Sequence, residues 1–259
     1  MEEINFTIDD QSITCEKDEM LLDVALANGF EIPHLCYHQA EPPYGSCRLC
    51  LVEITKRGSS WVEASCTYPV RDNGIEVKTD TEDVRRFRKM NMELLLAQCP
   101  NSEEVQEMAR DMGVEGGRLP PDGQNECLLC GLCVNVCRDL IGIGGINFVG
   151  RGADRRVTTP YDEPSKECIG CGACAEICPS GYIQIHDEDG VRRIEPFGIE
   201  CELVKCPECG RGYVPKKQLE YVKDELGEEK SELLRGCPVC KGQRRAEELK
   251  KIYDILESE

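Results

Sequence analysis

The sequence has 259 residues, enough for about two ordinary domains, and contains 19 cysteines. Its formal net charge of −18 argues against nucleic-acid binding, because phosphate binding requires a basic face. The acidic start MEEINFTIDD lacks the basic and apolar parts of a signal peptide, and no apolar run approaches the roughly 18 residues of a membrane span. We therefore expect a cytoplasmic protein without direct membrane insertion, whose cysteines bind metals instead of forming disulfides.

Residue patterns divide the chain into four segments. INFTI, DDQ and SITC predict a hairpin, EMLLDVALANG a short helix, and CLVEI, WVEAS and IEVKT three more strands, an order that favours a β-grasp fold. Capped apolar repeats predict two helices, followed by the linker GVEGGRLPPDGQ. The predicted α+β chain comprises a β-grasp [2Fe-2S] ferredoxin domain at 1–80, a helical segment and linker at 81–123, a bacterial-type 2[4Fe-4S] ferredoxin domain at 124–195, and a zinc-ribbon-like segment with four metal-binding cysteines and a terminal helix at 196–259.

Four cysteines with the spacing C-x10-C-x2-C-x15-C lie in the first segment. Four thiolates from a β-grasp loop and the strand beyond it suit a [2Fe-2S] cluster, although the first gap is longer than in the plant-type C-x4-C-x2-C pattern. A structural zinc is the alternative. His34 and His38 flank the first cysteine, but with four thiols available we expect them to pack or hydrogen-bond. The expected [2Fe-2S] ligands are Cys36, Cys47, Cys50 and Cys66.

The stretch IPHLCYHQAEPPYGSCRLCLVEI resembles the N-terminal [2Fe-2S] segment of the large iron–sulfur subunit of NADH dehydrogenases (respiratory complex I). It resembles equally the diaphorase iron–sulfur subunits of NAD-linked hydrogenases and formate dehydrogenases. The likeness covers residues 1 to about 100 and 124–187. In that family a cluster held by one histidine and three cysteines usually follows the long helix. The matching stretch LLLAQCPNSEEVQEMARDMG has only Cys99, so we expect that cluster to be absent and Cys99 to be a buried small apolar residue.

Two cysteine quartets follow, CLLCGLCVNVC and CIGCGACAEICP, each with the spacing C-x2-C-x2-C-x3-C. This is the run of bacterial two-cluster ferredoxins, in which the fourth cysteine ligates the other cluster. Pro179 follows the second run as expected, whereas Arg138 replaces the proline after the first. The residues between the quartets predict a small hairpin around INFVGRG and RRVTTP. The expected [4Fe-4S] ligand sets are Cys127, Cys130, Cys133 with Cys178, and Cys168, Cys171, Cys174 with Cys137.

Two C-x2-C pairs, CPECG and CPVCK, lie near the C-terminus and are typical of structural zinc held by four thiolates. A single iron of the rubredoxin type uses the same ligands. A plant-type [2Fe-2S] spacing that starts at Cys201 is a third interpretation, and it would leave Cys240 unused. The acidic stretch KDELGEEKSELL between the pairs argues against a ribbon that binds nucleic acid. We expect zinc on Cys206, Cys209, Cys237 and Cys240, which leaves Cys15, Cys99 and Cys201 without a metal.

The sequence contains no G-x-G-x-x-G, P-loop or hydrolase nucleophile motif, so we expect an electron-transfer subunit with no catalytic site of its own. The resemblance implies a flavin-containing NADH dehydrogenase-type subunit as one partner. A catalytic hydrogenase or formate dehydrogenase subunit, or a soluble ferredoxin, would be the other, and electron bifurcation in an anaerobe is compatible with this. One alternative is a free-standing polyferredoxin carrier, which would purify alone. Another is a redox-sensing regulator with a nucleic-acid-binding ribbon, which the net charge disfavours.

Overall fold

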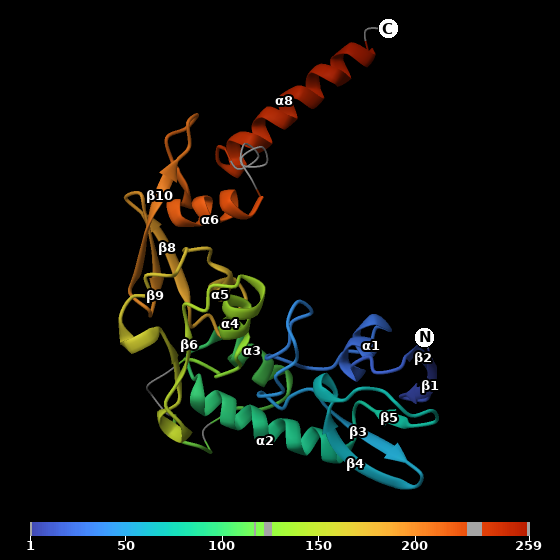
Figure 1. The fold of residues 1–259 in the computed structure, drawn as a ribbon. Coiled ribbons are helices and arrows are strands. Elements are labelled where there is room, and N and C mark those ends of the chain that lie inside the picture. The colour runs from blue at the N-terminus through green and yellow to red at the C-terminus, as the bar shows by residue number, and fades with distance from the viewer. Residues whose placement is uncertain (1, 117, 122–125, 227–234, 258–259) are drawn as a thin grey trace.

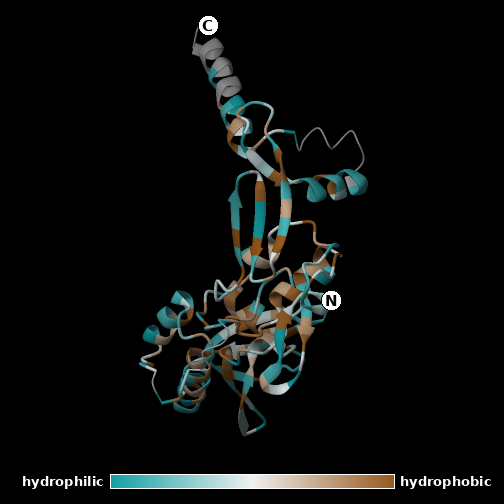
Figure 2. Ribbon diagram, turned by 90° about the vertical axis from the view of Figure 1, so that its left-hand side faces the viewer, coloured by the Kyte–Doolittle hydropathy of each residue, from teal (hydrophilic) through white to brown (hydrophobic). Residues whose placement is uncertain are grey.

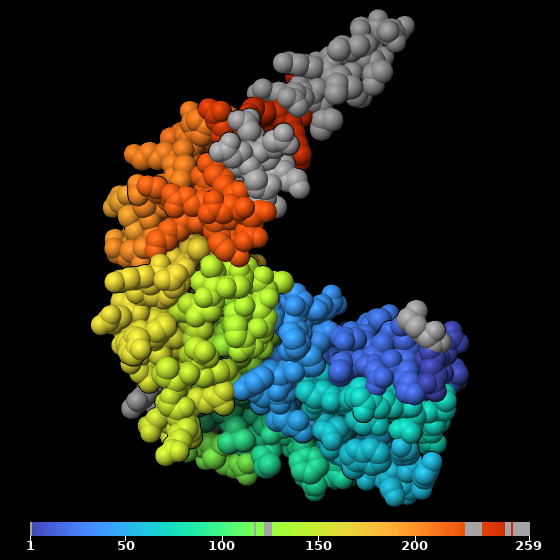
Figure 3. Space-filling model, in the orientation of Figure 1, coloured from blue at the N-terminus to red at the C-terminus, as the bar shows by residue number. Residues whose placement is uncertain are grey.

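The computed structural model describes residues 2–116, 118–121, 126–226 and 235–257, arranged as three successive lobes (Figure 1). The first lobe comprises residues 2–80, the central lobe the described part of 81–183, and the last lobe the described part of 184–257. Part of the predicted linker, at 117 and 122–125, and most of the acidic stretch between the C-terminal pairs, at 227–234, lie outside the described residues. In Figure 3 the central lobe lies between the other two.

A five-stranded mixed sheet forms the first lobe, in the order β2-β1-β5-β3-β4, with β1 and β5 parallel. Alternation in β1 turns Ile4, Phe6 and Ile8 inward, where they pack with apolar residues of helix α1 (Leu21–Ala27). The hairpin turn predicted at DDQ has Asp9 and Asp10 at positive φ, as a type I′ turn requires. The strands are β1 (Glu3–Ile8), β2 (Gln11–Glu16), β3 (Leu51–Lys56), β4 (Ser59–Ala64) and β5 (Glu76–Lys78).

Two helices connect the first lobe to the cysteine quartets. Helix α2 (Glu82–Gln98) begins after Thr81, whose side chain accepts a hydrogen bond from Val84 N, and α3 (Glu103–Asp111) begins after Ser102 in the same way. Both helices were predicted from these caps, and both are confirmed. Their buried faces pack with the loops that carry cysteines in the first and central lobes. The helices therefore hold the two cysteine regions against each other.

The rest of the central lobe consists of short elements around the quartets. The predicted hairpin between the quartets is confirmed as the antiparallel pair β6–β7. Helices α4 and α5, one from each quartet, contact each other. These elements are α4 (Leu132–Asn135), a π-helical turn (Val136–Leu140), β6 (Asn147–Val149), β7 (Arg156–Thr158) and α5 (Ala173–Glu176).

An antiparallel sheet in the order β11-β10-β9-β8 forms the last lobe, and helix α6 packs on β10 and β11. The sequence patterns did not predict β8, β9 or β10. Hydrophobic ribbon is concentrated where the first and central lobes meet, whereas hydrophobic and polar bands alternate along these strands (Figure 2). Among the described residues, no helix has the length and apolar character needed to cross a bilayer. The elements are β8 (Gln184–Glu188), β9 (Val191–Glu195), β10 (Ile199–Lys205), β11 (Gly212–Pro215), α6 (Lys216–Leu226) and α8 (Pro238–Glu257).

Candidate metal centres

The four cysteines of the first lobe come together as two hydrogen-bonded pairs, and all four are buried. The Cys47 thiol hydrogen-bonds the Cys36 sulfur and is the main cause that lowers the pKa of Cys36 to about 6. The Cys66 thiol does the same for Cys50, lowering its pKa to about 7. Cys36 also acts electrostatically on Cys50 and Cys66. The two pairs together offer four thiols, the number of ligands that a [2Fe-2S] centre requires.

The loop between α1 and β3 positions three of these thiols, and the turn at Ser65–Thr67 positions the fourth. Cys47 N donates to Cys36 Sγ at 3.3 Å, and Gly45, at φ +71°, lies so close to Thr67 that an added Cβ would be 2.9 Å from Thr67 Cγ2. Both flanking histidines have local partners, as expected. His34 Nδ1 lies 2.8 Å from Ile32 O, and His38 Nδ1 accepts from Ala40 N at 3.1 Å.

A buried cation lies beside this group of thiols. Arg88, on α2, is only 9% exposed, and its Nη2 donates to Leu51 O at 2.5 Å. Its Nε is buried and has no hydrogen-bond partner in the described part of the chain. Burial lowers the pKa of Arg88, while the charges of Asp80, Cys50 and Asp9 oppose that effect. An anionic [2Fe-2S] centre would supply the counter-charge that this guanidinium needs, so the residues present fit such a group.

The two quartets share one local structure. A glycine in the left-handed conformation, Gly131 at φ +85° and Gly172 at φ +86°, precedes a short helix in each. The third cysteine of each run, Cys133 or Cys174, lies in the helix's first turn. The positive φ lets the chain turn sharply before the helix, which directs the three closely spaced thiols of each run to one side.

The fourth cysteine of each quartet crosses to the other one. Cys178 lines one small cavity together with the first three cysteines of the first quartet. Burial is the main cause that raises the pKa of those three thiols, and Cys178 adds an electrostatic contribution to each. Cys137 contributes in the same way at Cys171 and Cys174, again after burial. Backbone amides also donate to sulfur, from Gly145 to Cys137 at 3.2 Å and from Gly170 to Cys168 at 3.4 Å.

The three groups of thiols adjoin in series. Cys36 raises the pKa of Cys130 electrostatically, and Cys174 acts likewise on Cys133, in each case after the larger effect of burial. Leu35, Cys36 and Cys47 share one buried cluster with Leu128, Cys130 and Leu132. The order along this series is first lobe, first quartet, second quartet.

An aromatic side chain links the first two groups. Tyr44, in the first-lobe cysteine loop, lies so close to Gly131 that a Cβ there would be 3.3 Å from the Tyr44 ring. Arg155 Nη2 donates to the Tyr44 hydroxyl at 2.8 Å, and its guanidinium lies 4.0 Å from the centroid of Phe148. The β6–β7 hairpin therefore contacts the cysteine loops of both lobes.

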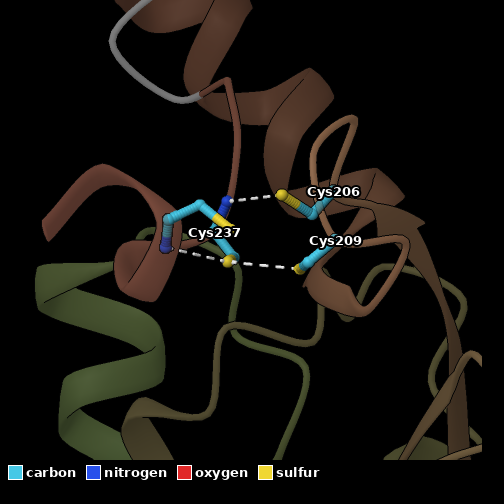
Figure 4. A group of neighbouring side chains, drawn as sticks. Cys206, Cys209 and Cys237 are labelled. Atoms are coloured by element: carbon cyan, nitrogen blue, oxygen red, sulfur yellow. Dashed lines mark hydrogen bonds between the residues drawn. The ribbon is translucent and has the colours of Figure 1, made fainter. Parts of the chain in front are cut away.

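The C-terminal cysteines form a more compact group. The sulfur atoms of Cys206, Cys209, Cys237 and Cys240 all lie within 4.8 Å of one another. The Cys209 and Cys237 sulfurs are 3.8 Å apart (Figure 4). A tetrahedral site with Zn–S bonds of about 2.3 Å requires a sulfur separation of about 3.8 Å, so these residues fit one ion. Backbone N–H groups of Cys237 and Cys209 lower the pKa of Cys206 to about 6, which favours the thiolate that a metal binds.

The three remaining cysteines lie in different surroundings. Cys15 is in the apolar core of the first lobe, and Cys99 is fully buried, as expected of small apolar residues. Cys201, on β10, lies against the second quartet, where its Sγ is 2.8 Å from the position of a Cβ added to Gly170. This placement argues against the plant-type interpretation that grouped Cys201 with Cys206. The alternation IECEL marks Cys201 as a buried strand residue, and that signal was available in the sequence.

Comparisons with known proteins agree with this geometry. Residues 1–82 match the family of 2Fe-2S iron-sulfur cluster binding domains, and residues 165–183 match 4Fe-4S binding domains. The chain is 30% identical over 235 residues to an NADH-quinone oxidoreductase subunit of Rhizobium meliloti, covering 81% of this chain and 27% of that protein. It is 31% identical over 242 residues to the alpha subunit of the NADPH-Fe(3+) oxidoreductase of Geobacter sulfurreducens, covering 84% and 28%.

A solved structure extends the match to the fold. A chain in the crystal structure of an NAD+-reducing [NiFe]-hydrogenase in the H2-reduced state aligns with a TM-score of 0.60 and 27% identity. The alignment covers 86% of this chain and 97% of that chain. The resemblance predicted from the sequence is thereby confirmed, while the chain spans little more than a quarter of the length of the curated relatives it matches.

Proposed function

We propose that this chain, which is homologous to the iron–sulfur subunits of NADH-quinone oxidoreductases and NAD-reducing hydrogenases, is an electron-transfer subunit of a multi-subunit NAD(P)H-linked oxidoreductase. Its centres would relay single electrons between a flavin-containing subunit and a catalytic hydrogenase or formate dehydrogenase subunit, or a soluble ferredoxin. The observation that carries this proposal is the series of adjoining thiol groups, from Cys36 beside Cys130 to Cys133 beside Cys174.

The ligands of the first centre would be the two pairs Cys36 with Cys47 and Cys50 with Cys66. Hydrogen bonds within each pair, the burial of all four thiols and the unpaired Nε of the buried Arg88 support this assignment. The lobe that holds them would be a β-grasp domain, because the parallel pairing of β1 with β5 and the packing of α1 on the sheet are features of that fold.

The other two centres would be [4Fe-4S] clusters with crossed ligands. One would be held by Cys127, Cys130, Cys133 and Cys178, which line one cavity. The other would be held by Cys137, Cys168, Cys171 and Cys174, supported by the electrostatic contribution of Cys137 to its neighbours. The crossed arrangement would tie the two halves of the central lobe together, because each centre would bind thiols from both runs.

Zinc would bind Cys206, Cys209, Cys237 and Cys240, since the group is compact enough for one ion.

We propose that the chain consists of four parts, with boundaries at residues 80, 123 and 195, and that the β8–β11 sheet joins the last two parts. When bound, iron–sulfur clusters accept and release single electrons at potentials set by charge, hydrogen bonds and solvent exposure. The residues around them orient the thiols, donate backbone hydrogen bonds and exclude water. We also propose a cytoplasmic location, because a reducing compartment keeps cysteine thiols available as metal ligands.

Metal analysis of the anaerobically purified full chain, combined with low-temperature EPR, tests these assignments. We expect about ten irons and about one zinc per chain, the sum of one two-iron centre, two four-iron centres and one zinc ion. About twelve irons without zinc would contradict the C-terminal assignment, and fewer than about six would contradict the paired four-iron centres.

A substitution separates the crossed ligand sets from uncrossed ones. Cys178→Ser should perturb the centre that contains Cys127, whereas Cys99→Ser, at a buried thiol outside every proposed set, should leave the iron content unchanged. If Cys178→Ser instead perturbs the centre that contains Cys171, the crossed assignment is wrong. Co-purification of the tagged chain with a flavoprotein would support the subunit role, while purification as a single species would favour a free carrier.

A further inference from the structure

The second quartet receives a cation from outside its own segment. Arg192 lies on β9, and its side chain is only 16% exposed. Its Nη1 donates at 3.0 Å to the carbonyl oxygen of Gly170, one of the two residues between Cys168 and Cys171. The same Nη1 lies 3.9 Å from the position of a Cβ added to Gly172, next to Cys171 and Cys174. The guanidinium therefore lies against the loop that carries three of the proposed ligands.

A carboxylate holds this guanidinium in place. Asp187, on β8, accepts from Arg192 Nε at 2.8 Å and from Nη2 at 2.7 Å, a two-point contact that fixes the guanidinium plane. The Asp187 side chain is 37% exposed, more than twice the exposure of Arg192. Water screens the more exposed charge more strongly. The field at the cysteine loop is accordingly dominated by the less exposed charge, that of Arg192.

A second cation reaches the same loop from α6. Lys217 Nζ donates at 2.6 Å to the carbonyl oxygen of Lys166, two residues before Cys168. The charges of Lys217 and Arg192 both lower the pKa of Cys201, after the larger effect of its hydrogen bond with Cys168. Lys217 is exposed, yet its effect on Cys201 is larger than that of Arg192.

The first quartet has a different environment. Its cavity is lined by its own thiols, by apolar residues and by uncharged polar groups, and none of the lining residues carries a formal charge. Burial raises the pKa of Cys127, Cys130 and Cys133, backbone hydrogen bonds lower the pKa of the first two, and the charges that act on all three are those of other thiols. The two groups of thiols, so alike in sequence, therefore differ in the charge that surrounds them.

We propose that Arg192, assisted by Lys217, gives the centre on the second quartet a higher reduction potential than the centre on the first. The inference rests on the proposed function, because it requires iron–sulfur centres at both quartets. One-electron reduction without proton uptake makes a centre more negative by one charge, and a fixed nearby cation stabilises that state. Transfer between the two oxidises the first centre and reduces the second, with one electron moved and no proton or bond exchanged.

Redox titration of the full chain with its iron–sulfur centres bound, followed by EPR, tests whether the charge of Arg192 raises the reduction potential of the centre on the second quartet. In Arg192→Gln we expect one of the two [4Fe-4S] waves to move to lower potential. A tenfold change in the electron distribution between the centres corresponds to about 59 mV for a one-electron couple. Arg192→Lys should retain part of the effect, and Asp187→Asn should move the same wave in the opposite direction, because it removes a negative charge. Loss or change of a wave in Cys171→Ser identifies which centre it is.

Arg193→Gln is the matched control, because Arg193 is the next residue on β9 but pairs with Glu200 and is 42% exposed. It should move neither wave. The inference is overturned if Arg192→Gln moves neither wave or both equally, or if Asp187→Asn moves the wave in the same direction as Arg192→Gln. If Arg192→Gln loses its iron, the opposite shift in Asp187→Asn and a downward shift in Lys217→Gln decide the question. Wild-type protein without two four-iron centres would refute the proposed function itself.

Discussion

The first lobe and the C-terminal cysteine group differ in the size of the apolar core that surrounds their thiols. In the first lobe, Cys50 and Cys66 belong to a large buried cluster of apolar side chains from the sheet and α1. Around the C-terminal group, the buried cluster consists of Cys206, Cys237 and Cys240, with Tyr213 packed against it. The comparison teaches that the first lobe can fold around its own core, whereas the C-terminal group depends on what its thiols bind.

The large apolar core of the first lobe also explains why buried charged side chains can occur there. The first lobe and its junction with the central lobe contain two buried charged side chains with unsatisfied atoms, Arg88 and Glu41. Each such group lowers the stability of the fold unless a partner compensates it. A lobe with a large apolar core tolerates this cost. We expect substitutions to separate the two regions by their dependence on metal.

The largest effect should follow from breaking the C-terminal group. Cys237→Ser removes one of four converging thiols, and structural zinc contributes on the order of 10 kcal/mol of apparent folding free energy in zinc-finger peptides. We expect loss of about one zinc per chain and rapid proteolysis near residues 206–240, while the iron content stays unchanged. Val239→Ser is the control, because Val239 lies between Cys237 and Cys240 and is exposed. Retention of zinc by Cys237→Ser would show that the group does not act as one site.

Removing apolar volume from the first lobe should have the next largest effect. Ile54, on β3, is fully buried in the core. Ile54→Ala should lower the free energy of unfolding of this lobe by about 2–5 kcal/mol, because it removes buried methyl groups and leaves a cavity. Denaturant unfolding of metal-free protein measures the loss, with Thr55→Ala on the opposite face as a control. If Ile54→Ala also lowered the zinc content of the protein, the first lobe and the C-terminal cysteine group would not be independent.

Replacing Arg88 should stabilise the metal-free protein against unfolding but lower the reduction potential of the metal-bound protein. Arg88→Met removes a buried cation with an unsatisfied Nε, so metal-free protein should gain about 1–3 kcal/mol in the free energy of unfolding. Loaded protein should instead show a lower potential of the [2Fe-2S] centre, because the cation no longer stabilises the reduced state. Arg85→Met is the control, since Arg85 lies on the same helix but is exposed and pairs with Asp80. If the potential shifted in Arg85→Met and not in Arg88→Met, Arg88 would not be the residue that stabilises the reduced [2Fe-2S] centre.

The sequence predicted the parts of this molecule that local patterns control. The C-x2-C spacings fix which thiols share a turn, and the caps at Thr81 and Ser102 fix where helices begin. Strand β9 was missed because Arg192 and Arg193 interrupt its apolar pattern, and β8 because most of its residues are polar, whereas the alternation IECEL in β10 was present and not used. The environments of Arg88, Glu41 and Cys201 could not be predicted either, since they depend on elements far apart in the sequence meeting in the fold.

The smallest effect, and the one that pH can reveal, concerns Glu41 in the first-lobe cysteine loop. Its side chain is 6% exposed, and both carboxylate oxygens lack partners in the described part of the chain. Burial is the main cause that raises the pKa of Glu41, and Asp139 raises it further, while His38 and Arg138 lower it. A carboxyl whose pKa is raised by folding binds more protons in the native state than in the unfolded state. The native state therefore loses stability as the pH rises from the unfolded pKa of about 4.3 through the folded one.

Glu41→Gln removes this pH-dependent loss and should stabilise the protein by about 1–2 kcal/mol at neutral pH. The gain should shrink as the pH falls toward 4, because the wild-type carboxyl is then protonated in both states. Thermal unfolding of the two proteins between pH 4 and pH 8 measures the difference, and Glu31→Gln, at an exposed position in the chain before the loop, should show no such trend. A gain that stays constant with pH would mean that folding does not raise the pKa of Glu41, because the carboxyl would then bind the same number of protons in the native and unfolded states.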